Sequence, residues 1–503
     1  MKKSFVGLLL LTFVVGAAQN IIPIPNDVKL GNGKLSVEMI KSLRLSNDSL
    51  RNESAFLGEY FDFSADGGNT ISLLIDKSID NVQGYSLTVD NRGVTIKAST
   101  RQGIFYGIQT LIQLIDDKEI PFIEICDKPR LEYRALMLDP ARHFLSAEDV
   151  KRYIDAIARY KYNYLHLHLS DDQGWRVEIK KYPRLTEVGS VRADTEGDGV
   201  PHRGYYTQEQ LRDIVAFAAQ RHIEIIPEID IPGHSVAAIA AYAELTCRDT
   251  IIPVRSEIGV SLDLLCAGNE KVFEMYGDIF EEICEIFPSK LIHLGGDEAP
   301  LTHWGQCPKC QALKKEKGYT DDQELMSYFF GRINQTLLRH NRTALFWYEV
   351  DVPDYPRNAI MYTWRNGLTP RVIEECREKG YRVICAPGEF AYFDYPEVKS
   401  DITAKSSSWI PALPFEKVYQ FDPCYGLSEE KSSHIIGVEA TVWGEYVPDL
   451  ETAFFRTFPR AFALAEAGWS KMSRREWNDF LLRTKRELEH LKSRKINFRQ
   501  PQQ

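Results

Sequence analysis

Two adjacent acids, Asp297 and Glu298, form the sharpest chemical feature of the sequence. They follow Gly295-Gly296 at the end of a short apolar run that starts at Leu291. Two carboxylates that approach each other in a pocket cannot both ionise cheaply, so one of them keeps its proton to a higher pH. A protonated acid beside an anion is what glycoside hydrolysis requires. The paired glycines permit a tight bend that brings both acids close to a substrate.

Further polar and aromatic residues also stand where short apolar runs end. In chain order they are Asp139, Arg142 and His143, then His166, His168, Asp171, Asp172 and Trp175, then Glu228, Asp230 and His234, and finally Trp347, Glu349, Trp364, Tyr392, Asp394, Trp443 and Glu445. Carboxylates and guanidinium groups bind sugar hydroxyls, and a flat indole stacks on the C–H face of a pyranose at low entropic cost. The combination predicts a carbohydrate pocket.

The elements that would position these residues alternate between strand and helix. Eight short apolar runs occupy residues 134–139, 163–169, 223–229, 291–295, 343–347, 359–364, 381–385 and 435–443. Most are separated by segments of helical periodicity, at 146–160, 207–221, 269–287, 320–340, 370–379 and 450–467. Eight strand-then-helix units describe an α/β fold, the (β/α)8 TIM barrel, more economically than a doubly wound sheet. In such a barrel the functional residues gather at the C-terminal ends of the strands.

A small α+β domain is predicted ahead of the barrel, over residues 19–127. Its β-rich segments span residues 72–76, 85–90 and 93–97. Residues 103–114 have a helical period. The barrel then covers 128–472, and residues 473–503 form an amphipathic helix and tail that we expect to dock on the barrel. The first domain shows no recognisable chemistry, so we expect it to have a structural role.

The first 18 residues have the pattern of a secretory signal peptide. Lys2-Lys3 precedes an apolar run at 5–15, which is too short to span a bilayer, and small residues at 16–18 place the cleavage after Ala18. No later apolar stretch approaches 18 residues, so we predict an exported protein, periplasmic or secreted, without a membrane span. The 503-residue chain carries a net charge of −10 and no basic run, which argues against nucleic acid as a partner.

Nine cysteines suit an exported protein, and the odd number leaves at least one thiol unpaired. Cys247 and Cys266 bracket a loop that a disulfide could close. Cys307 and Cys310 form a CxxC motif, which lacks the βαβ context of a redox site and has no second pair at zinc-site spacing along the sequence. We expect a local disulfide or plain thiols there. Four others lie in apolar patterns and are expected in the core: Cys126, Cys284, Cys376 and Cys385.

Several longer motifs occur in a characteristic order along the chain. They are LDPARHF at 138–144, HLHLSDDQGW at 166–175, IPEIDIPGH at 226–234, HLGGDE at 293–298, WGE at 443–445 and FPRA at 458–461. Together they resemble the β-N-acetylhexosaminidases of glycoside hydrolase family 20. The resemblance covers about residues 20–480 and includes the small α+β domain that precedes the barrel in that family.

The resemblance implies a retaining, substrate-assisted mechanism, in which the 2-acetamido oxygen attacks the anomeric carbon and forms an oxazolinium intermediate. It implies that Glu298 is the general acid and base, and that an ionised Asp297 orients and stabilises the acetamido group. His234 and Asp171 resemble the pair that supports Glu298, with Asp172 as the alternative to Asp171. The resemblance assigns substrate contacts to Arg142, Trp347, Trp364, Tyr392, Asp394, Trp443 and Glu445.

No metal or other cofactor is predicted. His166 and His168 point to the same side of a strand, and with His234 and Asp171 they could form a metal site. Histidines that are satisfied by hydrogen bonds inside the barrel are the preferred interpretation, because no other metal-binding pattern accompanies them.

The expected partner is an oligosaccharide or glycoconjugate with a terminal β-N-acetylhexosamine, whereas the natural glycan and the oligomeric state stay open. Two alternatives are retained. One is a two-carboxylate retaining glycosidase that pairs Glu298 with Glu349 or Glu445. The other is a barrel that binds amino sugars without cleaving them, although such a protein needs neither Asp297 nor Glu298.

Overall fold

The computed structural model describes residues 20–63, 67–248, 250–401 and 410–501, so the predicted signal peptide lies outside the described residues. The chain forms two compact units. One contains the segment up to Lys128 together with Arg474–Arg486, and the other contains Pro129–Ser473 together with the residues from Glu487 onward. The terminal segment 473–503, which we expect from the sequence to dock on the barrel, is divided between the two units.

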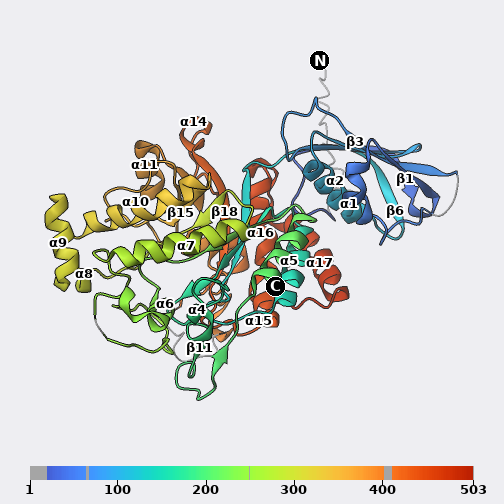
Figure 1. The fold of residues 1–503 in the computed structure, drawn as a ribbon. Helices are drawn as coiled ribbons and strands as arrows, with labels where there is room; N and C mark the ends of the chain where they lie inside the picture. The colour runs from blue at the N-terminus through green and yellow to red at the C-terminus, as the bar shows by residue number, and fades with distance from the viewer. Residues whose placement is uncertain (1–19, 64–66, 249, 402–409, 502–503) are drawn as a thin grey trace, which may run out of the picture. The chain divides into compact units, whose positions relative to one another are not determined.

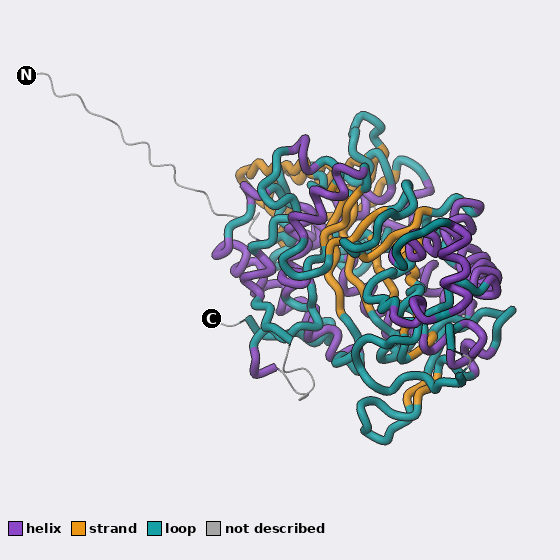
Figure 2. Tube along the Cα trace, turned by 90° about the vertical axis from the view of Figure 1, so that its left-hand side faces the viewer, coloured by secondary structure: helices purple, strands orange, loops and turns teal. Residues whose placement is uncertain are grey.

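The larger unit is a closed barrel of eight parallel strands that neighbour one another in chain order, which confirms the predicted (β/α)8 fold (Figures 1 and 2). The strands are β7 (Tyr133–Leu138), β8 (Tyr164–His168), β13 (Glu224–Glu228), β14 (Leu291–His293), β15 (Thr343–Trp347), β16 (Ile360–Thr363), β17 (Arg382–Cys385) and β18 (Ile435–Val442). Each strand falls on one of the predicted apolar runs. Met137, Ile226 and Leu345 are fully buried in the core of the barrel unit.

The main helices of this unit also lie where helical periodicity predicts them. They are α3 (Ala147–Ala158), α5 (Gln208–Ala219), α7 (Glu270–Ile286), α10 (Gln323–Arg339), α11 (Thr369–Lys379), α15 (Leu450–Thr457) and α16 (Arg460–Trp469). α3 and α5 begin at capping boxes, in which Ser146 pairs with Asp149 and Thr207 pairs with Gln210. Among the described residues, no helix has the length and apolar character that crossing a bilayer requires.

Two connections depart from a regular alternation of one strand and one helix. Residues 348–359, which join β15 to β16 and are all described, contain turns and extended chain but no helix. The predicted helix at 450–467 is divided into α15 and α16. The division falls at Pro459, which has no amide proton and cannot continue the hydrogen bonding of α15.

Two long insertions follow β13 and β14. The first leads to α7 and contains α6 (Val236–Ala241) and the 3-10 turn η4 (Ala243–Leu245), and the second leads to α10 and contains α8 (Thr302–Gln306) and α9 (Pro308–Lys317). α8 and α9 are labelled side by side in Figure 1. Shorter elements on other loops are β9 (Ser170–Asp171), β10 (Gly174–Trp175), α4 (Arg184–Glu187), β11 (Val191–Arg192), β12 (His202–Arg203), α12 (Gly388–Ala391), α13 (Phe415–Tyr419) and α14 (Glu429–Ser432).

The smaller unit is an α+β domain, as predicted. Its six-stranded sheet has the order β1-β6-β4-β5-β3-β2. The strands and helices are β1 (Asp27–Ser36), β2 (Ile40–Leu45), α1 (Arg51–Ala55), β3 (Asn69–Ile75), β4 (Tyr85–Asp90), β5 (Gly93–Ala98), α2 (Arg101–Leu114) and β6 (Glu119–Asp127). A tight hairpin joins β4 to β5 at Gly93, where φ is +136° and an added Cβ would lie 2.3 Å from the carbonyl oxygen of Thr70. The last helix, α17 (Trp477–Ser493), begins among the residues grouped with this unit.

Candidate active site

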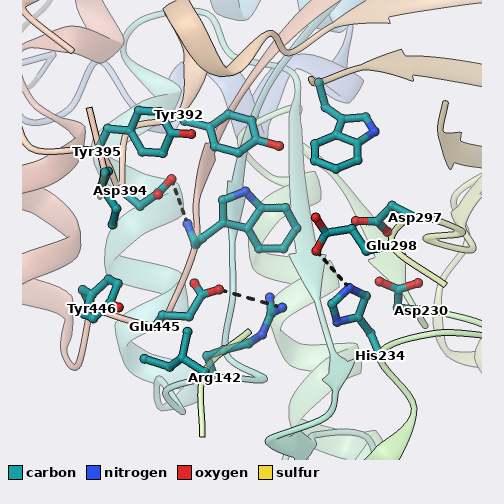
Figure 3. Close-up of a pocket in the computed structure, with 14 residues that line it drawn as sticks. Arg142, Asp230, His234, Asp297, Glu298, Tyr392, Asp394, Tyr395, Glu445 and Tyr446 are labelled. Carbon is teal, nitrogen blue, oxygen red and sulfur yellow. Dashed lines mark hydrogen bonds and ion pairs between the residues drawn. The ribbon is translucent and has the colours of Figure 1, made fainter. Parts of the chain in front are cut away.

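A pocket of about 810 Å³, including the space at its mouth, is formed by residues that follow the C-terminal ends of the barrel strands. The lining residues are Arg142, Asp230, His234, Ile258, Asp297, Glu298, Trp364, Tyr392, Asp394, Tyr395, Ile410, Trp443, Glu445 and Tyr446 (Figure 3). The fold therefore brings together residues as far apart in sequence as Arg142 and Tyr446. Of the predicted site residues, Asp171 and Trp347 do not line the pocket and lie buried behind those that do.

The turn after β14 positions the two adjacent acids. Gly295 and Gly296 have φ angles of +64° and +95°, and a Cβ added to Gly295 would lie 1.7 Å from Oδ1 of Asp230. Oδ1 of Asp230 accepts the amide proton of Gly296 at 3.0 Å, which holds this turn. Glu298 also has a positive φ, +47°, which is uncommon outside glycine. The turn leaves Asp297 buried, whereas the side chain of Glu298 is 33% exposed.

The two acids differ in their electrostatic surroundings. Burial, together with neighbouring negative charges that include Glu298, raises the pKa of Asp297 to about 7, although His234 opposes the shift. Burial also acts to raise the pKa of Glu298, but the hydrogen bond and positive charge of His234 outweigh it, so that this pKa is lowered. The higher pKa in this structure therefore belongs to Asp297, in contrast to the roles that the resemblance implies. Oδ1 of Asp297 is a buried acceptor with no hydrogen-bond donor among the described residues.

A chain of charged side chains supports Glu298 from behind. Nε2 of His234 lies 3.7 Å from Oε2 of Glu298, and Nδ1 of His234 lies 3.1 Å from Oδ1 of Asp171. Oδ2 of Asp171 pairs in turn with Nη2 of Arg142 at 2.7 Å. Burial alone would lower the pKa of His234, but the charge of Asp171 raises it well above its usual value. Asp172 instead accepts the amide proton of Val236 at 3.1 Å, so the contact with His234 is made by Asp171.

The opposite wall of the pocket carries Arg142, Glu445 and Asp394. Nη1 of Arg142 pairs with Asp139 at 3.0 Å, and Nη2 lies 3.9 Å from Oε1 of Glu445. Burial raises the pKa of Glu445 and, with the nearby charge of Glu445, raises that of Asp394 to about 8. Oδ1 of Asp394 accepts the amide proton of Trp443 at 3.5 Å. This wall offers a guanidinium and two carboxyl groups, which is the donor and acceptor set that sugar hydroxyls require.

Aromatic rings form the remaining wall. Trp364, Tyr392 and Trp443 line the pocket, and the ring centroids of Tyr392 and Trp443 are 6.3 Å apart. Trp347 lies behind them, with its ring centroid 5.7 Å from that of Trp443 and its Nε1 donating to Oε1 of Glu228 at 2.8 Å. Its indole is completely buried, so it supports the wall and does not form its surface.

Below the pocket, the histidines inside the barrel pair with acids. Nδ1 of His166 lies 2.8 Å from Oε1 of Glu439, and Nε2 of His168 lies 2.7 Å from Oδ2 of Asp171. His168 also contacts Glu228 through Nδ1. Each of the two histidines thus has at least one carboxylate partner.

Glu349, one of the alternative partners for Glu298, is already engaged. Arg365 donates to Oε2 and Oε1 of Glu349 at 2.8 and 2.6 Å, and the amide proton of Glu298 is donated to Oε1 at 3.2 Å. Sequence reasoning did not assign a role to Arg365 or to Asp230. Asp230 stands at the end of a barrel strand beside His234 in the IPEIDIPGH motif, which is the signal that identifies it.

The cysteines agree with one expectation and depart from another. All nine are unpaired, so Cys307 and Cys310 are plain thiols, which was one of the two alternatives. Cys126 is exposed because it points away from the buried face of β6, where alternate residues are covered. The three other cysteines predicted for the core are buried: Cys284, Cys376 and Cys385.

Comparison with protein families gives two matches that follow the two units. Residues 131–472 match the catalytic domain of glycosyl hydrolase family 20, and residues 18–128 match domain 2 of the same family. The matches include the barrel with all of its pocket residues and the α+β domain.

Individual relatives agree with this assignment. A β-hexosaminidase of Akkermansia muciniphila is 41% identical, over 82% of this chain and 84% of its own length. A β-hexosaminidase of Porphyromonas gingivalis is 36% identical, and the match covers 96% of this chain but 64% of the relative. The crystal structure of an exo-β-N-acetylglucosaminidase of Vibrio harveyi in complex with N-acetylglucosamine superimposes with a TM-score of 0.86, at 30% identity, over 97% of this chain and 79% of that one.

Proposed function

The chain belongs to glycosyl hydrolase family 20 and is a β-N-acetylhexosaminidase, and from this premise we propose a retaining, substrate-assisted exo-hydrolase. It removes terminal, non-reducing β-linked N-acetylglucosamine or N-acetylgalactosamine. The observation that carries the proposal is the pairing of a buried, unsatisfied Asp297 with a partly exposed Glu298 in a pocket lined by aromatic rings.

The reaction has two steps, and each balances without a nucleophile from the protein. In the first, the acetamido oxygen bonds to the anomeric carbon while the glycosidic bond breaks, and Glu298 gives its proton to the leaving oxygen. In the second, water attacks the anomeric carbon and gives a proton to Glu298, and the bond to the acetamido oxygen breaks. The first step leaves a cyclic oxazolinium ion, and the second restores the acetamido group with retained configuration.

Asp297 is suited to hold the acetamido group. Its unsatisfied Oδ1 can accept the acetamido N–H, which removes the cost of a buried acceptor without a donor. As a buried anion, Asp297 also stabilises the positive charge that develops on the acetamido nitrogen. No second carboxylate across the sugar ring is then required, which accounts for two neighbouring acids on one turn.

Substrate binding would reverse the order of the two pKa values. An N–H donated to Asp297 lowers the pKa of that group, because a hydrogen bond to the charged form favours it. The resulting anion lies beside Glu298 and raises the pKa of Glu298 by like-charge repulsion. Binding of the acetamido group would thus favour the anion of Asp297 and the protonated form of Glu298, which is the group that must donate a proton.

The remaining lining residues would orient the sugar. Arg142 is placed to bind the O3 and O4 hydroxyls, and Glu445 with Asp394 to bind O4 and O6. Tyr392 would donate to the acetamido oxygen, and Trp364 would stack on the sugar. Because the cluster is compact, it fits a terminal residue and favours exo-cleavage.

The two-carboxylate alternative is not favoured by the contacts of its partner acids. Both oxygens of Glu349 accept hydrogen bonds from Arg365, and Glu445 lies beside Arg142. A nucleophilic carboxylate needs an oxygen that is free to attack the anomeric carbon. A barrel that only binds amino sugars needs no general acid, so the non-catalytic alternative does not explain the contact between His234 and Glu298.

A panel of chromogenic β-glycosides tests the proposal. We expect cleavage of the N-acetylglucosaminide and the N-acetylgalactosaminide, and negligible cleavage of the glucoside, which lacks the acetamido nucleophile. Comparable rates on glucoside and N-acetylglucosaminide would overturn the substrate-assisted mechanism and favour the two-carboxylate one. Tight binding of N-acetylglucosamine without turnover of any member would favour the non-catalytic barrel.

We also propose that the protein is exported, in the periplasm or secreted, and acts there on oligosaccharides or glycoconjugates. The support is the signal-peptide pattern of residues 1–18. Export predicts that the mature protein begins at Gln19 and that most activity is found outside the cytoplasm. Amino-terminal sequencing of the protein from fractionated cells tests this, and an uncleaved cytoplasmic chain would refute it.

A further inference from the structure

Four cysteines from separate segments meet in one cluster outside the sugar pocket. Cys247 follows η4, Cys266 lies near the end of the first insertion, and Cys307 and Cys310 lie at the start of α9. Their sulfur atoms all lie within 4.8 Å of one another. Three of the side chains are buried, and Cys247 is partly exposed.

The spacing of the sulfur atoms fits a tetrahedral metal site. Sγ of Cys310 lies 3.7 Å from Sγ of Cys247 and 3.6 Å from Sγ of Cys266, which lies 3.8 Å from Sγ of Cys307. Zinc–thiolate bonds of about 2.3 Å in a tetrahedron give sulfur–sulfur edges of about 3.8 Å. Four soft thiolates in this geometry select zinc over harder divalent ions. We propose that Cys247, Cys266, Cys307 and Cys310 bind one Zn²⁺ ion in a closed structural site.

The local sequence builds this site at close range. Cys307 is the N-cap residue of α9, and Pro308 occupies the first helical position, where its missing amide proton costs nothing. The helix N-terminus carries partial positive charge, which favours the thiolate form of the CxxC sulfurs. Gly268 lets the loop that carries Cys266 pack directly on α9, because a Cβ there would lie 2.3 Å from the carbonyl carbon of Lys309.

The ion would connect the two insertions that carry the acid/base machinery. The amide proton of Leu265 is donated to the carbonyl oxygen of Pro232, two residues before His234, at 3.0 Å. The indole Nε1 of Trp304, six residues after Glu298, donates to the carbonyl oxygen of Leu265 at 2.9 Å. An ion bound by both insertions therefore holds the segment of His234 against the segment of Glu298. Four protein ligands leave no open coordination position, so the site has a structural and not a chemical role.

Metal analysis of the purified full-length chain is the first test, and it needs no variant. We expect one zinc per chain after purification without added metal, and all nine thiols free once the protein is denatured with a chelator. Two disulfides among the four cysteines, seen as four fewer free thiols and no zinc, would overturn the proposal. Iron in place of zinc would also overturn it, as would a reduced, folded chain that takes up no added Zn²⁺.

Matched variants then locate the ion. Cys310→Ser should lose nearly all bound zinc, whereas Cys376→Ser, which removes an equally buried thiol on α11, should retain one zinc per chain. Cys247→Ser should lose zinc and Cys247→His should keep it, because three cysteines and one histidine also form a structural zinc site. Full zinc in both Cys310→Ser and Cys247→Ser would place the metal elsewhere and overturn the assignment.

Cobalt gives a readout that is independent of folding yield and of activity. Reduced, zinc-free protein titrated with Co²⁺ should develop thiolate-to-cobalt charge-transfer bands that saturate at one equivalent and disappear when Zn²⁺ is added. The chelated wild-type chain should also melt at a lower temperature than the zinc-loaded one. Octahedral cobalt spectra, or no spectrum, would contradict four-thiolate coordination.

Discussion

At the scale of single residues, the difference between Asp297 and Glu298 arises from their burial. Asp297 is 7% exposed and lacks a donor for one oxygen, whereas Glu298 reaches the pocket surface beside His234. The same turn therefore presents one carboxyl group that responds to a substrate amide and another that reaches the leaving group. Their chemistry follows from position, because the two side chains are chemically almost identical.

Replacing Glu298 tests the acid and base role. Glu298→Gln keeps the shape of the side chain but removes the proton that is donated, so kcat should fall by about 10²–10⁴. Steady-state kinetics on the chromogenic N-acetylglucosaminide measure the effect. Glu281→Gln, an exposed acid on α7, is the control and should leave kcat unchanged. Near-normal turnover of Glu298→Gln would remove this residue from the mechanism.

Replacing Asp297 should separate activity from stability. The fold raises the pKa of Asp297 from 3.8 to about 7 because burial disfavours the anion. An acid with a raised folded pKa binds more protons in the folded state, so its contribution to stability falls as the pH rises from about 4 to about 7. Asp297→Asn lacks this proton. Its Tm relative to wild type should therefore increase between pH 5 and pH 8, while kcat falls by about 10²–10³.

The Tm of Asp297→Asn and of wild type is measured at both pH values, and kcat is measured at one of them. A Tm difference that is constant with pH would show that Asp297 titrates near its ordinary value. Retained activity would show that it does not assist the acetamido group.

Sequence reasoning located most pocket residues because each stands at the end of a barrel strand, and it could not resolve their depth. Trp347 is the last residue of β15 and Trp443 follows β18, yet one is covered by the other. The residues next to each tryptophan in the sequence do not indicate which of the two indoles reaches the pocket surface. The cysteine cluster was missed for a related reason, since Cys247 and Cys310 are 63 positions apart and only the fold of two insertions makes them neighbours.

At the scale of elements, the turn after β14 is the part of the fold on which the site depends most. Gly295→Ala would introduce a Cβ 1.7 Å from Oδ1 of Asp230 at a φ of +64°, so the turn would have to move. We expect loss of both activity and Tm, because the displaced turn carries both acids. Gly331→Ala on α10 is the matched control, since nothing lies within 4 Å of its Cβ position and alanine favours a helix. Kinetics and melts that do not distinguish the two variants would contradict this role of the turn.

The strands and helices that could be predicted are those marked by a pattern of neighbouring residues, such as a short apolar run or a capping box. The barrel strands are short and apolar, and the capping boxes at Ser146 and Thr207 mark the starts of α3 and α5. No helical segment was predicted at 348–359, and the structure has no helix there. Pro459 was visible in the sequence and could have divided the predicted helix at 450–467.

At the scale of the whole molecule, the residues of the terminal helix α17 are divided between the two compact units. Its first part, through Arg486, groups with the α+β unit, and the residues from Glu487 onward group with the barrel unit. In the barrel unit, Glu487 is fully buried and pairs with Arg159, whose Nε and Nη2 donate to it at 2.7 and 3.1 Å, and with the hydroxyl of Tyr160 at 3.0 Å. The predicted amphipathic helix thus contributes a buried carboxylate as well as apolar side chains to the barrel unit.

This ion pair gives a stability prediction that is remote from the chemistry. Burial acts to raise the pKa of Glu487, but Arg159 outweighs it and lowers the pKa, so the pair stabilises the fold above the unfolded pKa and loses this effect as the pH falls. Glu487→Gln removes the charge that compensates the partly buried Arg159 and should cost about 3 kcal/mol near neutral pH, with a smaller cost in acid. Glu489→Gln, an exposed position on the same helix, should change stability very little. The free energy of unfolding of both variants is measured with denaturant at two pH values. If Glu487→Gln loses the same stability at both pH values, packing and not charge accounts for the contribution of Glu487. The kcat of folded Glu487→Gln should match wild type, because the pair lies outside the pocket.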